Sequence, residues 1–242
     1  MLQTTTISFL EKLAKNNHKP WFDKHHDEYV AAKEDFEAFA GDILKSLADT
    51  DPVFKEQKAK DCVMRIYRDV RFSKDKTPYK TNFGAGFSKG GRKFTGAGYY
   101  LHIEPGDKSF AGGGIWMPEP PLLKAVRQEI DYNLQDFTNI IEDKKFKKFF
   151  KKIEGDQLKK PPQGYEADNP AVELLKMKSY VVSHNFTDED ITGKNFVKKV
   201  AEVYTSMKPF VDFLNGARLS RKEAWERAWK IIQKEMIEKL EG

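Results

Sequence analysis

The fold is decided by the stretch "GYYLHIEPGDKSFAGGGIW", residues 98–116. Its first half alternates apolar and polar side chains with a period of two, which is typical of a strand with one buried face. Gly106 and Asp107 form a turn signal, and a second apolar run follows at hairpin spacing. The stretch therefore predicts an antiparallel hairpin. Its first strand turns Tyr99, Leu101 and Ile103 to one side, and Tyr100, His102 and Glu104 to the other.

Other runs extend this hairpin into a sheet. The run "CVMRIYRDVRF", residues 62–72, alternates in the same way and predicts a strand before the hairpin. "NFGAGFS", residues 82–88, predicts a second strand, followed by a turn in "KGGRK". "SYVVSHNF", residues 179–186, predicts a later strand, which we expect at an edge of the same sheet. Together these runs predict a meander of about five to seven antiparallel strands.

Helical periodicity occurs before and after these strands. It predicts helices over residues 7–15, 20–47, 118–142, 170–176 and 193–215, and a last helix over 221–240, capped by Ser220, that carries Trp225 and Trp229. Helices surrounding a meander argue for an α+β fold. We therefore expect one α+β domain over residues 1–242. Helices pack on one face of its sheet, and it has a long N-terminal helix and a C-terminal helix.

Composition limits the class of protein. The chain has 242 residues, of which 39% are hydrophobic and 13% aromatic, which is enough for a substantial core. The net charge is +5, and it is concentrated in residues 51–100. One cysteine, Cys62, excludes an intramolecular disulfide and a multi-cysteine zinc site. The first residues lack a secretory pattern and no apolar run is long enough to span a bilayer, so we expect a cytoplasmic protein without a membrane partner.

The densest charge lies in "RIYRDVRFSKDKTPYK", residues 65–80, which holds six cationic side chains and two aspartates. On a strand, Arg65, Asp69 and Arg71 would project together, and the following lysines could gather over the same face. This arrangement favours a small anionic ligand, such as a phosphorylated one, in a basic cleft. The predicted ligand-binding residues are Arg65, Arg68, Arg71, Lys74, Lys76 and Lys80 for charge, Asp69 and Asp75 to orient them, and Tyr79, Tyr100 and Trp116 as walls.

Few motifs indicate a reaction. The glycine-rich runs match neither a P-loop nor a dinucleotide fingerprint, and no HExxH pair or GxSxG elbow occurs. We expect no metal site, and no motif identifies a cofactor. If chemistry occurs, His102 beside Glu104 is one candidate proton carrier and Asp69 is another. The alternative for His102 is a hydrogen-bonded structural histidine. Glycines 112–114 suggest a bulge or a close approach, by a ligand or by an aromatic such as Phe87 or Tyr99.

Two other functions stay open. The run "KKFKKFFKKI", residues 144–153, could join the basic strand in one stripe that binds nucleic acid or a protein, although an ordinary amphipathic helix fits the run better. Alternatively, the charges at residues 65–80 are purely structural and pin the sheet to the N-terminal helices, with "NNHKPWF" closing against them.

Three segments carry a resemblance to a known family. They are "FLEKLAKNNHKPWFDKHHDEY", "RIYRDVRFSKDKTPYKTNFGAGF" and "GYYLHIEPGDKSFAGGGIWMPEPPLLKAVRQEI", and the match extends through "PPQGYEADNPAVELLKMKSY". Because of the order and spacing of these segments, the chain resembles the domain of unknown function 2461 family of bacteria and fungi. The resemblance implies a compact unit containing helices and strands. It implies no reaction, cofactor or ligand.

Overall fold

The sheet has four strands in the part of the chain that the computed structural model describes, residues 1–91 and 94–217. They are β1 (Phe83–Phe87), β2 (Gly98–Ile103), β3 (Ser109–Ile115) and β4 (Tyr180–Phe186), and they lie side by side in that order, each antiparallel to the next. The predicted meander and the position of β4 at an edge are confirmed. The predicted number of five to seven strands is wrong.

Helices make up most of the remaining structure. The described residues form α1 (Thr4–Lys15), α2 (Lys19–Lys24), α3 (His26–Thr50), the 3-10 helix η1 (Pro52–Phe54), α4 (Ala59–Cys62), α5 (Pro120–Tyr132), α6 (Leu134–Glu142), α7 (Lys144–Phe149), α8 (Val172–Leu175), α9 (Asp188–Thr192) and α10 (Phe196–Gly216). None of the helices in these ranges is both long and apolar enough to cross a membrane. The predicted helix over 221–240 lies outside the described residues, as does the end of the turn at 92–93.

Two predicted helices are each interrupted. The helix expected over 20–47 is divided at His25, which ends α2 and precedes α3 with φ −110° and ψ 26°. The helix expected over 118–142 is divided at Asn133, with φ −121° and ψ 40°. Both residues depart from helical dihedrals, and asparagine competes for backbone hydrogen bonds through its side chain.

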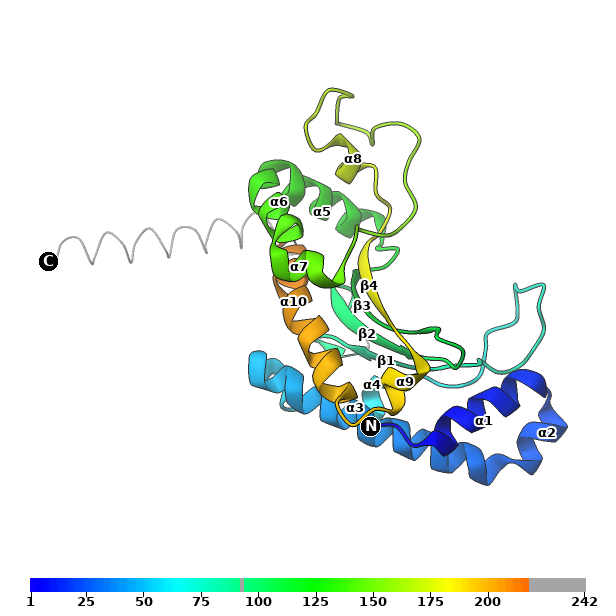
Figure 1. The fold of residues 1–242 in the computed structure, drawn as a ribbon. Coiled ribbons are helices and arrows are strands. Elements are labelled where there is room, and N and C mark those ends of the chain that lie inside the picture. Colours follow the sequence, from blue (N-terminus) through cyan, green and yellow to red (C-terminus); the bar gives the residue numbers. More distant parts are fainter. Residues whose placement is uncertain (92–93, 218–242) are drawn as a thin grey trace, which may run out of the picture.

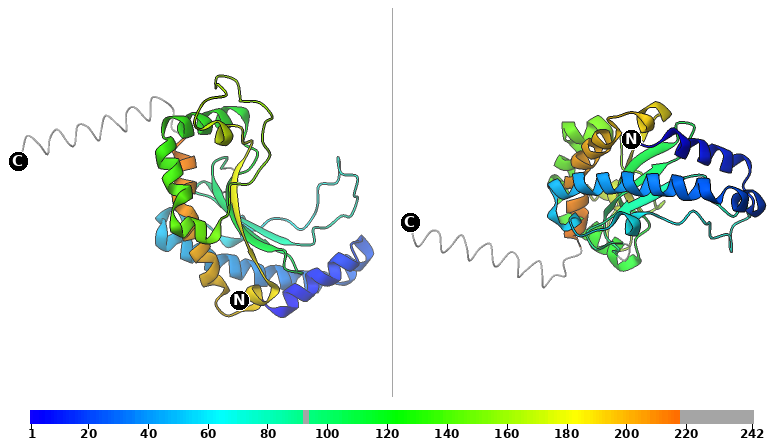
Figure 2. Two further views of the ribbon diagram at one scale, coloured as in Figure 1. Left: turned by 45° about the horizontal axis from the view of Figure 1, so that its top comes forward. Right: turned by 90° about the horizontal axis from the view of Figure 1, so that it is seen from below.

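The sheet has one packed face and one open face. Figures 1 and 2 show α3 and α10 on the same side of the strands, where α10 contacts β3 and α3 contacts β1. That side carries buried residues such as Phe83, Leu101 and Val182. In the described ranges no helix crosses the other side, which we call the open face. It carries Tyr100 and His102, which the sequence predicted to lie together.

The glycines of β3 allow α10 to approach closely. A Cβ atom built on Gly113 would lie 2.4 Å from the sulfur of Met207 in α10 and 2.6 Å from the carbonyl oxygen of Gly98. Gly114 has φ +118°, a conformation that favours glycine. The predicted close approach at Gly113 is therefore made by Met207 of α10 and by the backbone of β2, including the Cα of Tyr99 at 3.4 Å, and not by Phe87.

The strand predicted over 62–72 does not form. Residues 59–62 are helical, and the following chain pairs only at two isolated bridges, Val63 with Ala85 and Tyr67 with Tyr79. Met64 N donates to Gly84 O and Lys80 N donates to Ile66 O. Between the two bridges, the three residues 64–66 therefore face the five residues 80–84, and this bulge-like insertion of two residues interrupts the ladder.

The first part of the run "KKFKKFFKKI" is a short amphipathic helix, α7, as the sequence favoured, and the helix ends at Phe149, so residues 150–153 continue beyond it. Phe146 and Phe150 are buried in the same core cluster as α10, and Phe146 lies 5.7 Å from the ring of Phe210. The lysines of α7 point away from this core and are exposed.

Candidate functional site

A chain of polar side chains crosses the open face of the sheet along β2. His102 Nε2 lies 2.9 Å from Glu104 Oε2, and His102 Nδ1 lies 3.4 Å from the Tyr100 hydroxyl. A carboxylate can only accept, so the Nε2–H of His102 donates to Glu104, and in a neutral imidazole Nδ1 is then the acceptor for the hydroxyl. Glu104 thus fixes the tautomer of His102. We call these three residues the polar chain.

The polar chain is partly shielded from water. The side chains of His102 and Glu104 are 16% and 22% exposed. The Phe110 ring stacks on His102 at 4.8 Å and 14°. The Tyr100 ring lies over Gly84, where a Cβ atom would come within 2.7 Å of the phenol oxygen. Gly84 is therefore needed for the position of Tyr100.

Burial raises the pKa of Tyr100, a hydrogen bond from Asn82 opposes this rise, and the charge of Glu104 adds to it. Tyr100 therefore remains a neutral hydrogen-bond donor at neutral pH. Its weak, long contact to His102 is the point at which the polar chain is most easily opened.

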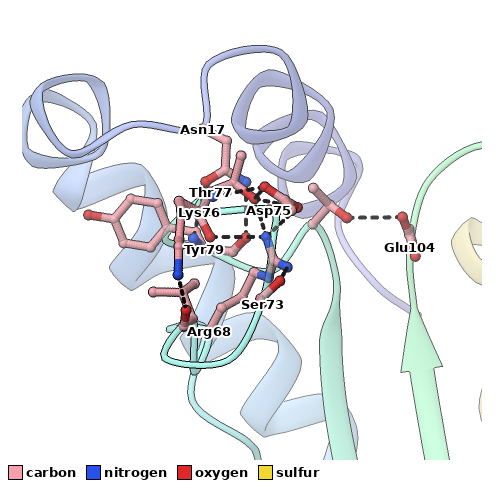
Figure 3. Close-up of polar contacts among 10 residues, drawn as sticks. Asn17, Arg68, Ser73, Asp75, Lys76, Thr77, Tyr79 and Glu104 are labelled. Carbon is pink, nitrogen blue, oxygen red and sulfur yellow. Dashed lines mark hydrogen bonds and ion pairs between the residues drawn. The ribbon is translucent and has the colours of Figure 1, made fainter.

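The insertion before β1 supplies two more members of the site. Thr81 Oγ1 donates to Glu104 Oε1 at 3.0 Å, and the side chain of Asn82 bonds the Tyr100 hydroxyl. Figure 3 shows the contact that reaches Glu104 from this segment. Because the two extra residues leave the ladder, their side chains can turn towards β2.

Lys80 lies immediately before this insertion and is half-buried. Burial lowers its pKa, and the charge of Arg65 lowers it further. Neither Lys80 nor Arg65 makes an ion pair to any carboxylate within the described ranges. Lys80 and Arg65 are therefore two neighbouring cations that form no ion pair in the described ranges, and the carboxylate whose pKa the charge of Arg65 lowers, Asp69, is itself paired with Arg71.

The other predicted cations do not converge on this place. Arg68 closes its own loop, residues 68–78: its guanidinium donates to Asp75 at 2.6 Å, to the Thr77 carbonyl at 3.0 Å and also to the Thr77 hydroxyl (Figure 3). Lys76 donates to the carbonyl of Val70 at 2.9 Å. The charges of this loop therefore stabilise its own conformation.

Asp69 is also outside the polar chain. It forms an exposed ion pair with Arg71 at 2.7 Å, and the hydrogen bond to Arg71 lowers the pKa of Asp69. Lys74 is exposed on the same loop. The structure thus brings the candidate proton carrier His102 together with Glu104, but not with Asp69. The predicted convergence of Arg68, Arg71, Lys74 and Lys76 around one ligand is not found.

Two of the aromatic residues that the sequence predicted as walls of the ligand site, Tyr79 and Trp116, lie outside the polar chain. Tyr79 is buried and stacks on Phe22 at 4.0 Å and 13°. Trp116 is 68% exposed but follows β3, six residues after Phe110, the cross-strand partner of His102. At about 3.3 Å per residue, roughly 20 Å separates Trp116 from His102. Of the predicted walls, only Tyr100 belongs to the polar chain.

The two basic segments do not form one stripe. In Figures 1 and 2, α7 lies beside α10, whereas loop 68–78 projects at the other end of the molecule, near α1 and α2.

In the ranges that the structure covers, no group of histidine, cysteine and carboxylate side chains could hold a metal ion. Cys62 is buried, as its position on an apolar face predicted.

Residues 5–213 match the family described as conserved hypothetical protein (DUF2461). The chain belongs to the DUF2461 family. No curated protein and no solved structure matches it.

The structure explains two motifs of this DUF2461 chain as halves of one clamp. Asn17 donates its side-chain amide to the Tyr79 carbonyl at 2.9 Å and accepts from the Tyr79 amide at 3.1 Å (Figure 3). With the Phe22 ring on Tyr79, these bonds fasten loop 68–78 to the corner between α1 and α2. The segment "NNHKPWF" therefore does close against the basic stretch.

The sequence did not identify Thr81, Asn82, Gly84 or Phe110 as members of the site. Gly84 and Phe110 could have been found, because they are the register partners of His102 on β1 and β3. The roles of Thr81 and Asn82 depend on the insertion, for which the sequence gives no local signal.

Proposed function

We propose that this DUF2461 protein binds a small anionic ligand at Lys80 and Arg65, beside the polar chain on the open face of its sheet. The observation that carries this proposal is the half-buried Lys80, which has Arg65 close by and no carboxylate partner among the described residues. A cation in this position costs free energy in the empty protein. A bound anion would remove that cost and gain charge-assisted hydrogen bonds.

The basic loop supports this site indirectly. Its cations are paired within the loop or exposed, so the loop orders the residues before β1 rather than supplying the charge. The predicted ligand chemistry is kept in this proposal, but its residues are now Lys80, Arg65, Asn82, Tyr100 and His102. A phosphate or a phosphorylated metabolite fits two adjacent cations beside neutral donors.

The polar chain gives the same site a means of moving a proton. Glu104 holds His102 so that Nδ1 is an acceptor. A hydroxyl of the ligand that displaces the Tyr100 hydroxyl would meet this nitrogen and could pass its proton to it. In this proposal His102 is the general base and Glu104 orients it.

The test is a thermal-shift titration with inorganic phosphate, pyrophosphate and a sugar phosphate at low and high salt. Occupation at about 100 times Kd should stabilise the wild-type protein by about 2.7 kcal/mol. Lys80→Met should lose this stabilisation. Lys74→Met removes an exposed lysine of the adjacent loop and should keep it. Equal stabilisation of the wild type and Lys80→Met by all three anions would exclude the proposed site.

A further inference from the structure

A second surface feature lies between α6, α7 and the segment that follows them, and it shares no residue with the polar chain. It is a cavity of about 250 Å³ that is open to solvent on one side. Phe146, Phe150 and Met177 are buried at its floor, and its sides are Ile141, Ile153 and Leu174, which are half-buried. An apolar cavity of about 150 Å³ is enough for benzene, so this one accommodates a longer alkyl or aryl group.

The rim of the cavity is charged, and its charges are not balanced. Both rim carboxylates are already paired: Glu142 with Lys147, and Glu173 with Lys176 at 2.6 Å. Lys151 and Lys152 also line the cavity and are exposed. Neither forms an ion pair to any residue in the described ranges. The mouth therefore carries two uncompensated cations above an apolar floor.

We propose that this cavity binds a medium-chain alkyl carboxylate, with its chain on the phenylalanine floor and its carboxylate at Lys151 and Lys152. Burial of the alkyl chain supplies most of the affinity. The lysines supply the preference for an anionic head group, and their long side chains can reach over the apolar mouth. This site does not depend on the one proposed for Lys80.

The positions of the paired lysines strengthen the inference. Lys148 lies 4.7 Å above the Phe149 ring and 3.8 Å from Glu202, and Lys147 is bound to Glu142. These two lysines thus have partners in the fold. Three lysines line the cavity, Lys147, Lys151 and Lys152, and of these only Lys151 and Lys152 form no ion pair among the residues described.

The experiment measures binding of hexanoate, octanoate and decanoate, each kept monomeric, by calorimetry on the full chain. Affinity should rise by roughly fourfold for each added methylene until the cavity is filled. The double variant Lys151→Ala/Lys152→Ala should bind decanoate roughly five- to tenfold more weakly and 1-decanol about equally well. The matched control Lys159→Ala/Lys160→Ala removes two exposed lysines that do not line the cavity, and it should behave as the wild type.

A second variant tests the apolar part. Ile153→Trp fills the cavity from its half-buried side and should abolish decanoate binding without lowering the melting temperature. Lys80→Met should leave decanoate binding unchanged, which separates this site from the open face. The proposal is overturned if decanoate does not bind, if affinity does not depend on chain length, or if the two double lysine variants bind decanoate equally well.

Discussion

At the scale of the residue, Lys80 stands in an environment that disfavours its charge. Burial and Arg65 both lower its pKa. Lys89 is the opposite case: burial lowers its pKa, but hydrogen bonds to Asp51 and Asp212 outweigh this and raise it. The same residue type therefore costs stability at one site and contributes stability at the other, because only Lys89 has carboxylate partners among the described residues.

Substitution of Lys80 gives a prediction with a definite sign. At neutral pH Lys80 is charged in the folded and unfolded states, and the folded state bears the cost. Lys80→Met should therefore raise the free energy of unfolding by a few tenths to about 1 kcal/mol, a range typical of partly exposed charges. As pH rises towards 10.5, the folded protein releases this proton first, so the difference between wild type and variant should shrink.

Urea unfolding at about pH 7 and about pH 10 measures this difference. Lys89→Met is the control of opposite sign: it should lower stability at neutral pH, and its effect should fade only as pH rises through the raised pKa of Lys89. A Lys80→Met protein less stable than the wild type at neutral pH would contradict the environment described for Lys80.

Some site residues were predictable and others were not, for a physical reason. Tyr100, His102 and Glu104 follow from the alternation of β2, because a strand places every second side chain on one face. The hydrogen bonds of Arg68 could not be predicted from any local pattern in the sequence. Its partners Asp75 and Thr77 lie within the same loop, and alternation cannot distinguish a strand from a loop that closes on itself.

At the scale of the element, the run 62–72 shows how alternation can mislead. Val63 and Ile66 are buried, but Phe72 at the end of the apolar face is 95% exposed. The backbone bonds that would extend the ladder go instead from Arg68 N to Pro78 O and from Lys80 N to Ile66 O. The segment is thus a clamped loop rather than a strand.

The clamp between this loop and the N-terminal helices is a prediction at the same scale. Tyr79 is buried, and its backbone amide and carbonyl are paired by Asn17. Asn17→Ala leaves both groups unpaired, so it should destabilise the protein by roughly 1–3 kcal/mol and speed hydrogen exchange at the Tyr79 amide. Exchange measured by NMR, together with urea unfolding, checks both effects.

The neighbouring Asn16 provides the matched control. Its side chain donates to the Lys12 carbonyl at the end of α1 and does not reach the loop. Asn16→Ala should therefore leave the exchange of the Tyr79 amide unchanged. If the Tyr79 amide exchanges at the same rate in Asn16→Ala and Asn17→Ala, Asn17 does not hold the loop.

At the scale of the whole molecule, one side of the sheet packs against helices and the other side carries polar residues. The side under α3 and α10 carries the core, and the open face carries the polar chain. Figure 2 shows α3 and α10 on one side of the strands. The cavity beside α7 belongs to the helical layer. Lys80 and the two cavity lysines share no partner among the described residues, so the effects of Lys80→Met and Lys151→Ala/Lys152→Ala on the free energy of unfolding should add, which urea unfolding of the combined variant measures.

Two glycines test this division of the sheet. A Cβ atom on Gly113 would collide with Met207 of α10 and with the backbone oxygen of Gly98, whereas one on Gly86 would meet only the end of the Met64 side chain at 3.6 Å. Gly113→Ala should therefore lower the free energy of unfolding by about 1–3 kcal/mol, the usual cost of overpacking. Gly86→Ala should be neutral or stabilise by up to about 1 kcal/mol, because alanine reduces the entropy of the unfolded chain. Both glycines lie in strands, so their β-propensities cancel in the comparison, and equal losses in urea unfolding would mean that the open face is packed as tightly as the core.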